Sequence, residues 1–203
     1  AIATPRPDAR GTTLSMADET GPPTTGPIPA PPLDGAHAWL NVPRALTWHD
    51  LRGKVVLLDF WTYGCVNCMH LLPDFRALEE RFRRELVIIG VHSPKFTNER
   101  STDNLRRILV RYEIEHPVVN DAELRIWRAY GARVWPTRVI VDPAGQLVGT
   151  ATGEGNLPGF MQAIDTVIRV FEEGGAINRN PLPVQLERDR LADSPLLFPG
   201  KVL

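Results

Sequence analysis

The strongest constraint on this chain is a run of apolar residues that ends shortly before a pair of cysteines. Residues 55–61 read Val-Val-Leu-Leu-Asp-Phe-Trp, and Cys65 and Cys68 follow within seven positions. A run this apolar is typical of a strand buried on both faces, as in a parallel sheet. From Leu71 to Phe82 apolar residues recur at helical spacing. The chain is therefore predicted to pass from a buried strand into a helix that starts at the cysteines.

Further along, apolar segments alternate with amphipathic ones. The order β-α-β-α-β-α-β-β-α predicts a three-layer α/β/α fold with a mostly parallel central sheet and a C-terminal β-hairpin. The hairpin turn at 142–145 has Pro and Gly where a type I turn favours them. The predicted strands are 55–61, 86–91, 117–119, 137–141 and 146–150, and the predicted helices are 47–51, the segment after Cys65, 101–112, 122–130 and 157–172.

Proline content divides the chain into three parts. Residues 1–36 hold eight of the nineteen prolines, a composition that buries too little apolar surface to offset the entropy of ordering, so an extended arm is expected. Residues 37–175 are the predicted domain. Residues 176–203 become Pro-rich again and read as a linker. The apolar cluster at 195–199 indicates that further structure follows it.

Composition excludes several functional classes. Hydrophobic residues make up 43% of the chain and charged residues 23%, which are globular values. With a net charge of -1 and no basic stripe, neither nucleic acid nor an anionic membrane surface is an expected partner. No apolar run approaches the roughly 20 residues of a membrane span. The expected compartment is the cytoplasm, and an extracytoplasmic location in a bacterium stays open as the alternative.

The two cysteines lie where a helix start favours thiolate chemistry. Unpaired N–H groups and the positive end of the helix dipole both stabilise a negative sulfur, and the thiolate is the form that attacks disulfides. Cys65 is therefore predicted to be the exposed nucleophile, and Cys68, one turn further, to resolve the mixed disulfide. No cofactor is needed. The alternative is half of a zinc site, but no second cysteine pair supplies the four ordinary ligands. His70 does not obviously converge with both thiols, and His92 could join them only through folding.

Asp59 and Pro136 are the other predicted catalytic residues. Asp59 interrupts the buried strand, where burial raises a carboxyl pKa and makes the group a candidate proton carrier. The alternative is a hydrogen-bonded core aspartate with no kinetic role. Pro136 follows the bulky Trp135 at the head of a strand, so the bond between them is a candidate cis peptide that leaves backbone groups free for an extended peptide. An ordinary trans proline is the alternative.

Five residues near the cysteines are predicted to contact substrate. Trp61, Tyr63 and Trp135 are placed as an aromatic rim, with burial in the core as the alternative for each. Val66 and Asn67 lie between the cysteines. Three further features, His92, Arg133 and the Gly153-Glu154-Gly155 turn, have no assigned role.

Three separated elements of this sequence resemble motifs of the thioredoxin superfamily. The elements that carry the resemblance occur in its order and spacing, namely Asp59-Phe60-Trp61, Cys65-x-x-Cys68 and Trp135-Pro136-Thr137. The resemblance implies the thioredoxin fold, a nucleophilic Cys65, a resolving Cys68, a proton-transferring Asp59 and a cis Pro136. A βα insertion over 91–130 is similar to the TlpA-like branch of that superfamily.

A closer resemblance covers roughly residues 39–203. Cys65-Val66-Asn67-Cys68, the segment 90–96 and the Gly153-Glu154-Gly155 turn are similar to the thioredoxin-like domain of the NHL-repeat-containing protein 2 family and its bacterial relatives. In that family a β-propeller of NHL repeats follows, which implies that residues 176–203 lead toward one. Some animal members carry a cysteine where this chain has Gly64, so no regulatory thiol is expected there.

The predicted function is that of a thiol-disulfide oxidoreductase acting on protein or peptide disulfides. A reducing partner, either a thioredoxin reductase-like protein or a small thiol, would restore the dithiol. The alternative is a non-catalytic interaction module within a multidomain NHL-repeat protein, because a fold alone does not determine function.

Overall fold

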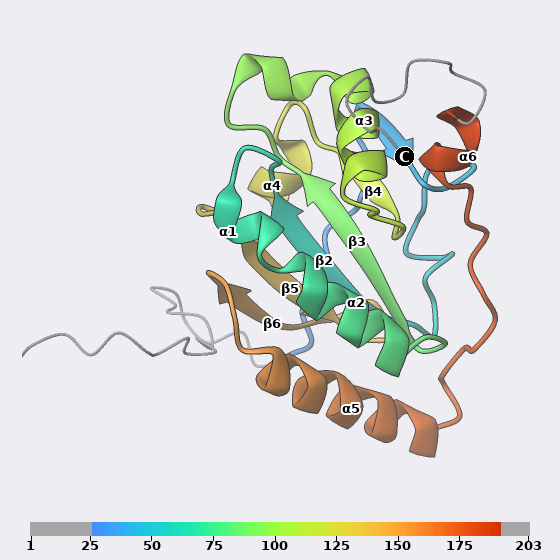
Figure 1. Cartoon of the computed structure of the whole chain (residues 1–203). Coiled ribbons are helices and arrows are strands. Elements are labelled where there is room, and N and C mark those ends of the chain that lie inside the picture. The colour runs from blue at the N-terminus through green and yellow to red at the C-terminus, as the bar shows by residue number, and fades with distance from the viewer. Residues whose placement is uncertain (1–25, 192–203) are drawn as a thin grey trace, which may run out of the picture.

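The computed structural model describes residues 26–191, which build one six-stranded sheet with helices packed on it (Figure 1). Neighbouring strands follow the order β1-β4-β3-β2-β5-β6. The strands are β1 (Ala38–Leu40), β2 (Val55–Trp61), β3 (Leu86–His92), β4 (Val118–Asn120), β5 (Thr137–Val141) and β6 (Leu147–Thr152). The helices are α1 (Val66–Met69), α2 (Leu72–Arg81), the 3-10 helix η1 (Thr97–Arg100), α3 (Thr102–Arg111), α4 (Arg125–Ala129), α5 (Leu157–Glu173) and α6 (Glu187–Leu191).

The sheet is mixed rather than mostly parallel. β2, β3 and β4 run parallel, whereas β1 pairs antiparallel with β4, β5 with β2, and β6 with β5. The direction of β5 follows from the length of α4. A parallel strand would need a crossover that returns along the sheet, and the five residues of α4 span only about 7 Å. The chain therefore enters β5 at the carboxyl end of β2 and runs back beside it.

One face of the sheet is covered by α2 and α5; in Figure 1, α2 lies in front of β2 and β3, and α5 lies below β6. Their apolar stripes pack on alternate residues of β2 and β3, as the helical spacing from Leu71 to Phe82 predicts. The helix after Cys65 is broken, however, into α1 and α2. Pro73 lies in the first turn of α2, where its missing N–H leaves no gap in the helical hydrogen bonds. The buried side chains of this cluster are Val55, Leu57, Leu71, Phe75, Leu78, Phe82, Leu86, Ile88, Ile140, Ala151, Phe160 and Ile164.

The opposite face is covered by α4 and by irregular segments, so the second helical layer is thin. Leu46, Leu51 and Trp127 pack there against β2, together with residues from before β1. The predicted helix over 47–51 is wrong, because this segment forms successive turns. The carboxylate of Asp50 accepts hydrogen bonds from the backbone N–H and the hydroxyl of Thr47, at 2.9 and 2.7 Å, as at a helix start, but Gly53 with its φ of 80° ends the segment after a single turn.

Packing continues beyond the predicted domain limits of 37 and 175. Ala30 and Leu33 are buried against the sheet, and residue 30 donates a backbone hydrogen bond to the hairpin turn. On the C-terminal side, the segment after α5 returns along the domain and its Gln185 N–H donates to the carbonyl of Asn41 at 3.0 Å. α6 then places the buried Glu187 2.5 Å from Arg106 on α3. The predictions for residues 1–25 and 192–203 lie outside the described residues.

Among residues 26–191, no helix is long and apolar enough to cross a bilayer.

Candidate active site

A tight loop carries the chain from β2 to the cysteines. The N–H of Ser93 donates to the carbonyl of Trp61 at 2.8 Å, which extends the pairing of β2 and β3 to the loop. The N–H of Cys65 then donates to the carbonyl of Thr62 at 3.1 Å. Cys65 keeps an extended backbone as the N-cap of α1, and Cys68 lies inside the helix. Both cysteines are therefore held at a helix start, as the sequence predicts.

The two thiols differ in accessibility, although both belong to the core. Cys65 retains 7% of its surface and Cys68 only 1%. The prediction of an exposed Cys65 therefore needs correction, since its side chain packs in one cluster with Trp61 and Cys68, against the partly exposed Trp135. Cys65 is still the more accessible of the two, so an incoming group meets its sulfur first.

The bond between Trp135 and Pro136 is cis, and it lies directly beside the nucleophile. The Sγ atom of Cys65 is 4.0 Å from the carbonyl oxygen of Trp135. Two segments seventy positions apart in sequence thus meet at one point. The candidate nucleophile and the backbone before the cis proline are brought together.

Asp59 lies in the interior, beneath the cysteine helix. Its carboxyl is buried, and its Oδ1 atom has no hydrogen-bond partner among the described residues. Burial raises its pKa to about 7, against the opposing attraction of His116 and Arg138. Burial also raises the pKa of Cys68, and the hydrogen bond with Cys65 and the nearby Asp59 act in the same direction. A carboxyl that titrates near neutrality therefore stands close to a thiol that needs a base to become a thiolate.

The three aromatic residues predicted as a rim occupy different environments. Trp61 is buried edge-on against His92, with ring centroids 5.3 Å apart, so it belongs to the core and not to the rim. Tyr63 is partly exposed, stacks on the other side of His92 at 5.2 Å and donates its hydroxyl proton to the carbonyl of Asn98. The prediction of Trp61 as a rim residue is wrong because its indole packs inward against Gly90, where the absence of a side chain leaves room for the ring.

Trp135, Val66 and Asn67 lie at the surface, as predicted. Trp135 is partly exposed and its indole N–H donates to the carbonyl of Ser93 at 2.8 Å. The Lys95 ammonium sits 4.9 Å from its ring centroid. Val66 is 64% exposed and Asn67 is also exposed. These three residues border Cys65 and are each at least partly exposed to solvent.

The two histidines considered as metal ligands point elsewhere. His70 is exposed and its Nδ1 lies 2.9 Å from the carboxylate of Glu154. His92 is buried between the aromatic rings, and burial lowers its pKa to about 4, so it is neutral at pH 7. Within residues 26–191, no group of three His, Cys, Asp or Glu side chains is placed to hold a metal ion.

The sequence prediction missed Glu99. It is buried in η1, and its carboxylate accepts hydrogen bonds from the Thr62 hydroxyl at 2.7 Å and from the N–H groups of Lys95 and Phe96 at 2.7 and 3.2 Å. It thus connects the inserted segment to the loop before Cys65. No sequence signal distinguishes Glu99 from the surrounding polar surface residues.

Arg138, also missed, is a buried arginine within β5. The sequence does contain a signal for Arg138, because this charged residue interrupts a mostly apolar strand just as Asp59 does. Both residues lie on the central strands that carry the site, and they are Cα partners across the β2–β5 pairing.

The sequence is similar to those of several known proteins. Residues 53–147 match the family described as Thioredoxin-like. NHL repeat-containing protein 2 of Gallus gallus is 43% identical over 178 residues, which cover 86% of this chain and 24% of that protein. Thiol-disulfide oxidoreductase ResA of Halalkalibacterium halodurans is 30% identical over 113 residues, which cover 54% of this chain and 60% of that protein.

A solved structure is similar over most of its length. The crystal structure of the thioredoxin-like superfamily protein SPOA0173 superposes with a TM-score of 0.63 at 25% identity, covering 70% of this chain and 96% of that one. The present chain spans about a quarter of the length of the NHL-repeat relative. Sheet order, cis proline and cysteine pair agree with these likenesses, and residues 53–147 lie within a thioredoxin-like domain whose sequence is similar to that of ResA.

Proposed function

We propose that this domain is a thiol-disulfide oxidoreductase that acts on protein or peptide disulfides. The observation that carries the proposal is the position of the Cys65 sulfur, 4.0 Å from the carbonyl oxygen before the cis Pro136. A substrate strand lying along that backbone would bring its disulfide to the more accessible thiol. The similarity to ResA, which is named as a thiol-disulfide oxidoreductase, supports the same chemistry.

The first step is attack by the Cys65 thiolate on the substrate disulfide. A bond forms between Cys65 Sγ and one substrate sulfur while the substrate S–S bond breaks, and the other substrate sulfur leaves as a thiolate that takes a proton from solvent. The product is a mixed disulfide. Its formation needs access to Cys65 alone, which agrees with the greater burial of Cys68.

The second step is attack by Cys68 on the Cys65 sulfur. The Cys68 thiol first gives its proton to the Asp59 carboxylate, which is suited to this role because its pKa of about 7 leaves it able to accept and release a proton near neutrality. The Cys65–Cys68 bond forms while the bond between Cys65 Sγ and the substrate sulfur breaks, and that sulfur leaves as a thiolate. The substrate disulfide has gained two electrons and the cysteine pair has lost two. A dithiol protein or a small thiol restores the pair.

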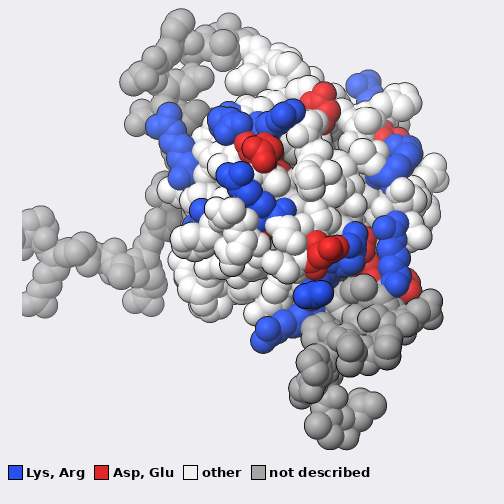
Figure 2. Space-filling view, turned by 90° about the horizontal axis from the view of Figure 1, so that it is seen from above, with Lys and Arg blue, Asp and Glu red and all other residues white. Residues whose placement is uncertain are grey.

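The surface around Cys65 supports an extended, partly apolar substrate segment. Val66, Phe96 and Val134 are exposed by 64%, 62% and 48%, and Phe96 adjoins Lys95 at the Trp135 ring. Figure 2 views the molecule from above, the side toward which β2 and β3 point in Figure 1, and shows separate groups of Lys, Arg, Asp and Glu with uncharged surface between the groups. The same apolar residues favour the alternative of a non-catalytic docking module.

Trapping the mixed disulfide separates the two functions. The chain has two cysteines, so a Cys68→Ser variant leaves Cys65 as its one thiol. We expect this variant to accumulate a stoichiometric adduct with a disulfide-bonded peptide, detected by intact mass, while the parent releases reduced peptide. Cys65→Ser is the matched control and should form no adduct. No adduct with Cys68→Ser, together with no peptide reduction by the parent, would favour the docking module. Peptide reduction by Cys65→Ser at the parent rate would instead contradict the role of Cys65 as the nucleophile.

We also propose that an NHL-repeat β-propeller accompanies this domain in the full-length protein. The proposal is supported by the 43% identity to NHL repeat-containing protein 2, of which this chain spans 24%. Sequencing of the complete transcript would show whether NHL repeats follow residue 203.

A further inference from the structure

Arg138 occupies an unusual position for a charged residue. It lies in the middle of β5, retains 2% of its surface, and is the Cα partner of Asp59 in the antiparallel pairing with β2. Directly paired residues on adjacent antiparallel strands point to the same face, with Cβ atoms about 5 Å apart. The guanidinium and the Asp59 carboxyl therefore share one buried environment, in which each would be costly without an opposite charge.

The guanidinium is fixed by the Gly153-Glu154-Gly155 turn. Its two terminal nitrogens donate to the carbonyls of Gly155 at 2.9 Å and Gly153 at 2.6 Å. Both glycines have a positive φ, of 80° and 86°, a conformation that residues with side chains rarely adopt. Two carbonyls of the turn thus accept hydrogen bonds from one guanidinium. This gives a structural role to the Gly153-Glu154-Gly155 turn, which had none in the sequence analysis.

The remaining surroundings of the guanidinium are an aromatic ring and two carboxylates. The guanidinium carbon lies 4.4 Å from the ring centroid of Phe160 on α5, and the Nε atom has no hydrogen-bond partner among the described residues. Burial lowers the pKa of Arg138, and the carboxylates of Asp59 and then Asp74 oppose that effect. Asp59 is thus the largest negative influence on this cation.

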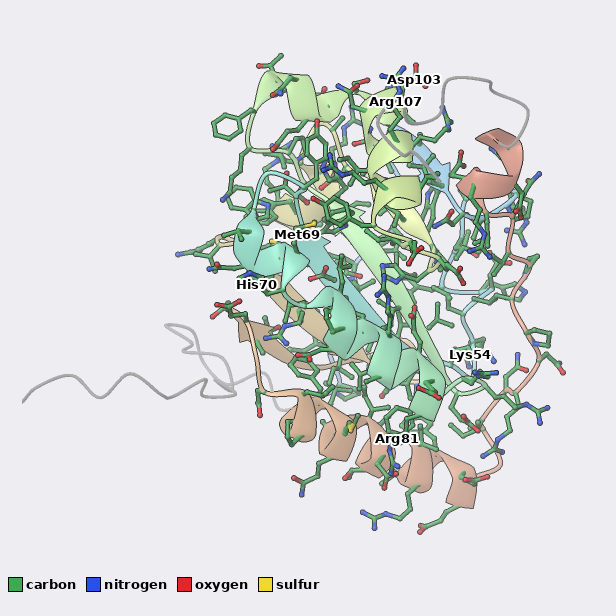
Figure 3. All side chains as sticks on the ribbon, in the orientation of Figure 1. Lys54, Met69, His70, Arg81, Asp103 and Arg107 are labelled. Atoms are coloured by element: carbon green, nitrogen blue, oxygen red, sulfur yellow. The ribbon has the colours of Figure 1, made fainter. Side chains whose placement is uncertain are left out.

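The same turn reaches the cysteine helix. Glu154, its middle residue, pairs with His70, which follows Cys68 by two positions. Figure 3 labels His70 at the junction of α1 and α2, on the side toward the end of β6. Arg138 therefore binds, through its guanidinium, the turn that flanks the cysteines, while its Cα is paired with that of Asp59 on β2.

We propose that Arg138 is a positioning residue for the thiol-disulfide reaction, which presents a fixed positive charge to Asp59 and so favours the carboxylate that accepts the Cys68 proton. The inference rests on the proposed function. The groups that face Asp59 are Arg138 from β5, Cys68 from α1 and His116 from the segment before β4, whose Nδ1 is 3.1 Å from Glu79 on α2. Of these, Arg138 is the one permanent cation.

The test compares two replacements that separate charge from shape. Arg138→Gln removes the charge and keeps a donor for the turn, whereas Arg138→Lys keeps the charge and loses the fork. Asp59 is titrated by carboxyl carbon NMR in each reduced protein, and the resolving step is timed against pH with a preformed mixed disulfide on Cys65. Loss of a nearby opposite charge raises a carboxyl pKa by about one unit or more. The expected result for Arg138→Gln is an Asp59 midpoint about one unit higher and resolution about fivefold slower at pH 7, with Arg138→Lys close to the parent.

Three outcomes decide the matter. An Asp59 midpoint in Arg138→Gln equal to that of the parent overturns the inference. If Arg138→Gln does not fold, Arg138→Lys decides, because a midpoint close to the parent supports a charge role and an upward shift of about one unit contradicts it. Failure of the proposed function looks different, since the parent would then reduce no disulfide at all while the NMR midpoint still moved with the Arg138 charge.

Discussion

Neutralising Asp59 should stabilise the protein in a pH-dependent way. The perturbation is Asp59→Asn, which keeps the size and shape of the side chain and removes its ability to ionise. The carboxyl is buried, has an unpaired oxygen, and has a pKa raised to about 7 from an ordinary value of 3.8. Asparagine mimics the protonated form, so the comparison isolates the free energy of holding a charge in the interior.

The magnitude follows from the difference between the two pKa values. Below pH 3.8 the carboxyl is protonated in the folded and unfolded chains, and it contributes no difference. Between pH 3.8 and 7 the unfolded chain releases its proton while the folded chain keeps it, so stability falls as pH rises, and it levels off above 7. About three pKa units at about 1.4 kcal/mol each correspond to about 4 kcal/mol. The attraction of Arg138 and His116 is already contained in the raised pKa.

Urea unfolding of the reduced proteins from pH 4 to 9 measures this difference. The free energy of unfolding of Asp59→Asn should exceed that of the parent by about 4 kcal/mol at pH 8, and the gap should close near pH 4. Asp165→Asn is the control, since that carboxylate is exposed on α5 and lies 3.4 Å from Arg81 in a surface pair worth less than about 1 kcal/mol. A gain that is absent at pH 8, or that is the same at every pH, would refute the assignment of Asp59 as a buried titrating group.

Three further perturbations probe the surroundings of the site. Gly64→Ala should lower the free energy of unfolding in urea by about 1–3 kcal/mol, because an added Cβ would clash with the buried Glu99 carboxylate. Stability equal to that of the parent would contradict this. The free energy of unfolding of the parent should fall by up to about 3 kcal/mol as pH drops from 6.5 toward 4, because the pKa of His92 in the folded protein is about 4. His92→Phe should remove this loss. Urea curves at pH 7 and 4 test this, and parallel losses in both proteins would disprove it. Phe75→Ala, in the core under α2, should cost about 3–5 kcal/mol, whereas the exposed Val66→Ala should change stability by less than about 0.5 kcal/mol.

Much of the site was predictable because its residues violate the pattern of the elements that hold them. A carboxylate in a buried strand, a proline at the head of another and two cysteines at a helix start each conflict with ordinary packing, and the structure places all of them together. Arg138 carries the same kind of signal in β5. Glu99 carries none, because its burial arises from the tertiary path of the inserted segment and not from its sequence neighbours.

The fold was predictable in class but not in the direction of every strand. Apolar runs and helical spacing identified β2, β3, β5 and α2, whose local sequence and burial agree. The short strand β1 was missed because three residues at the sheet edge show no period. The start of α4 was misplaced because Leu124 has a left-handed backbone and Asp121 accepts hydrogen bonds from the first helical N–H groups, an arrangement that depends on the preceding strand.

The central claim is that Cys65 and Cys68 form a reversible redox couple, and equilibration of the protein in glutathione buffers tests it most directly. The oxidised fraction is read by alkylation and intact mass. The account predicts a single two-electron transition between dithiol and disulfide near about −270 to −200 mV, the range of thioredoxins and glutaredoxins. A pair that forms no disulfide at any buffer potential would contradict the account and leave the docking module as the function of this domain.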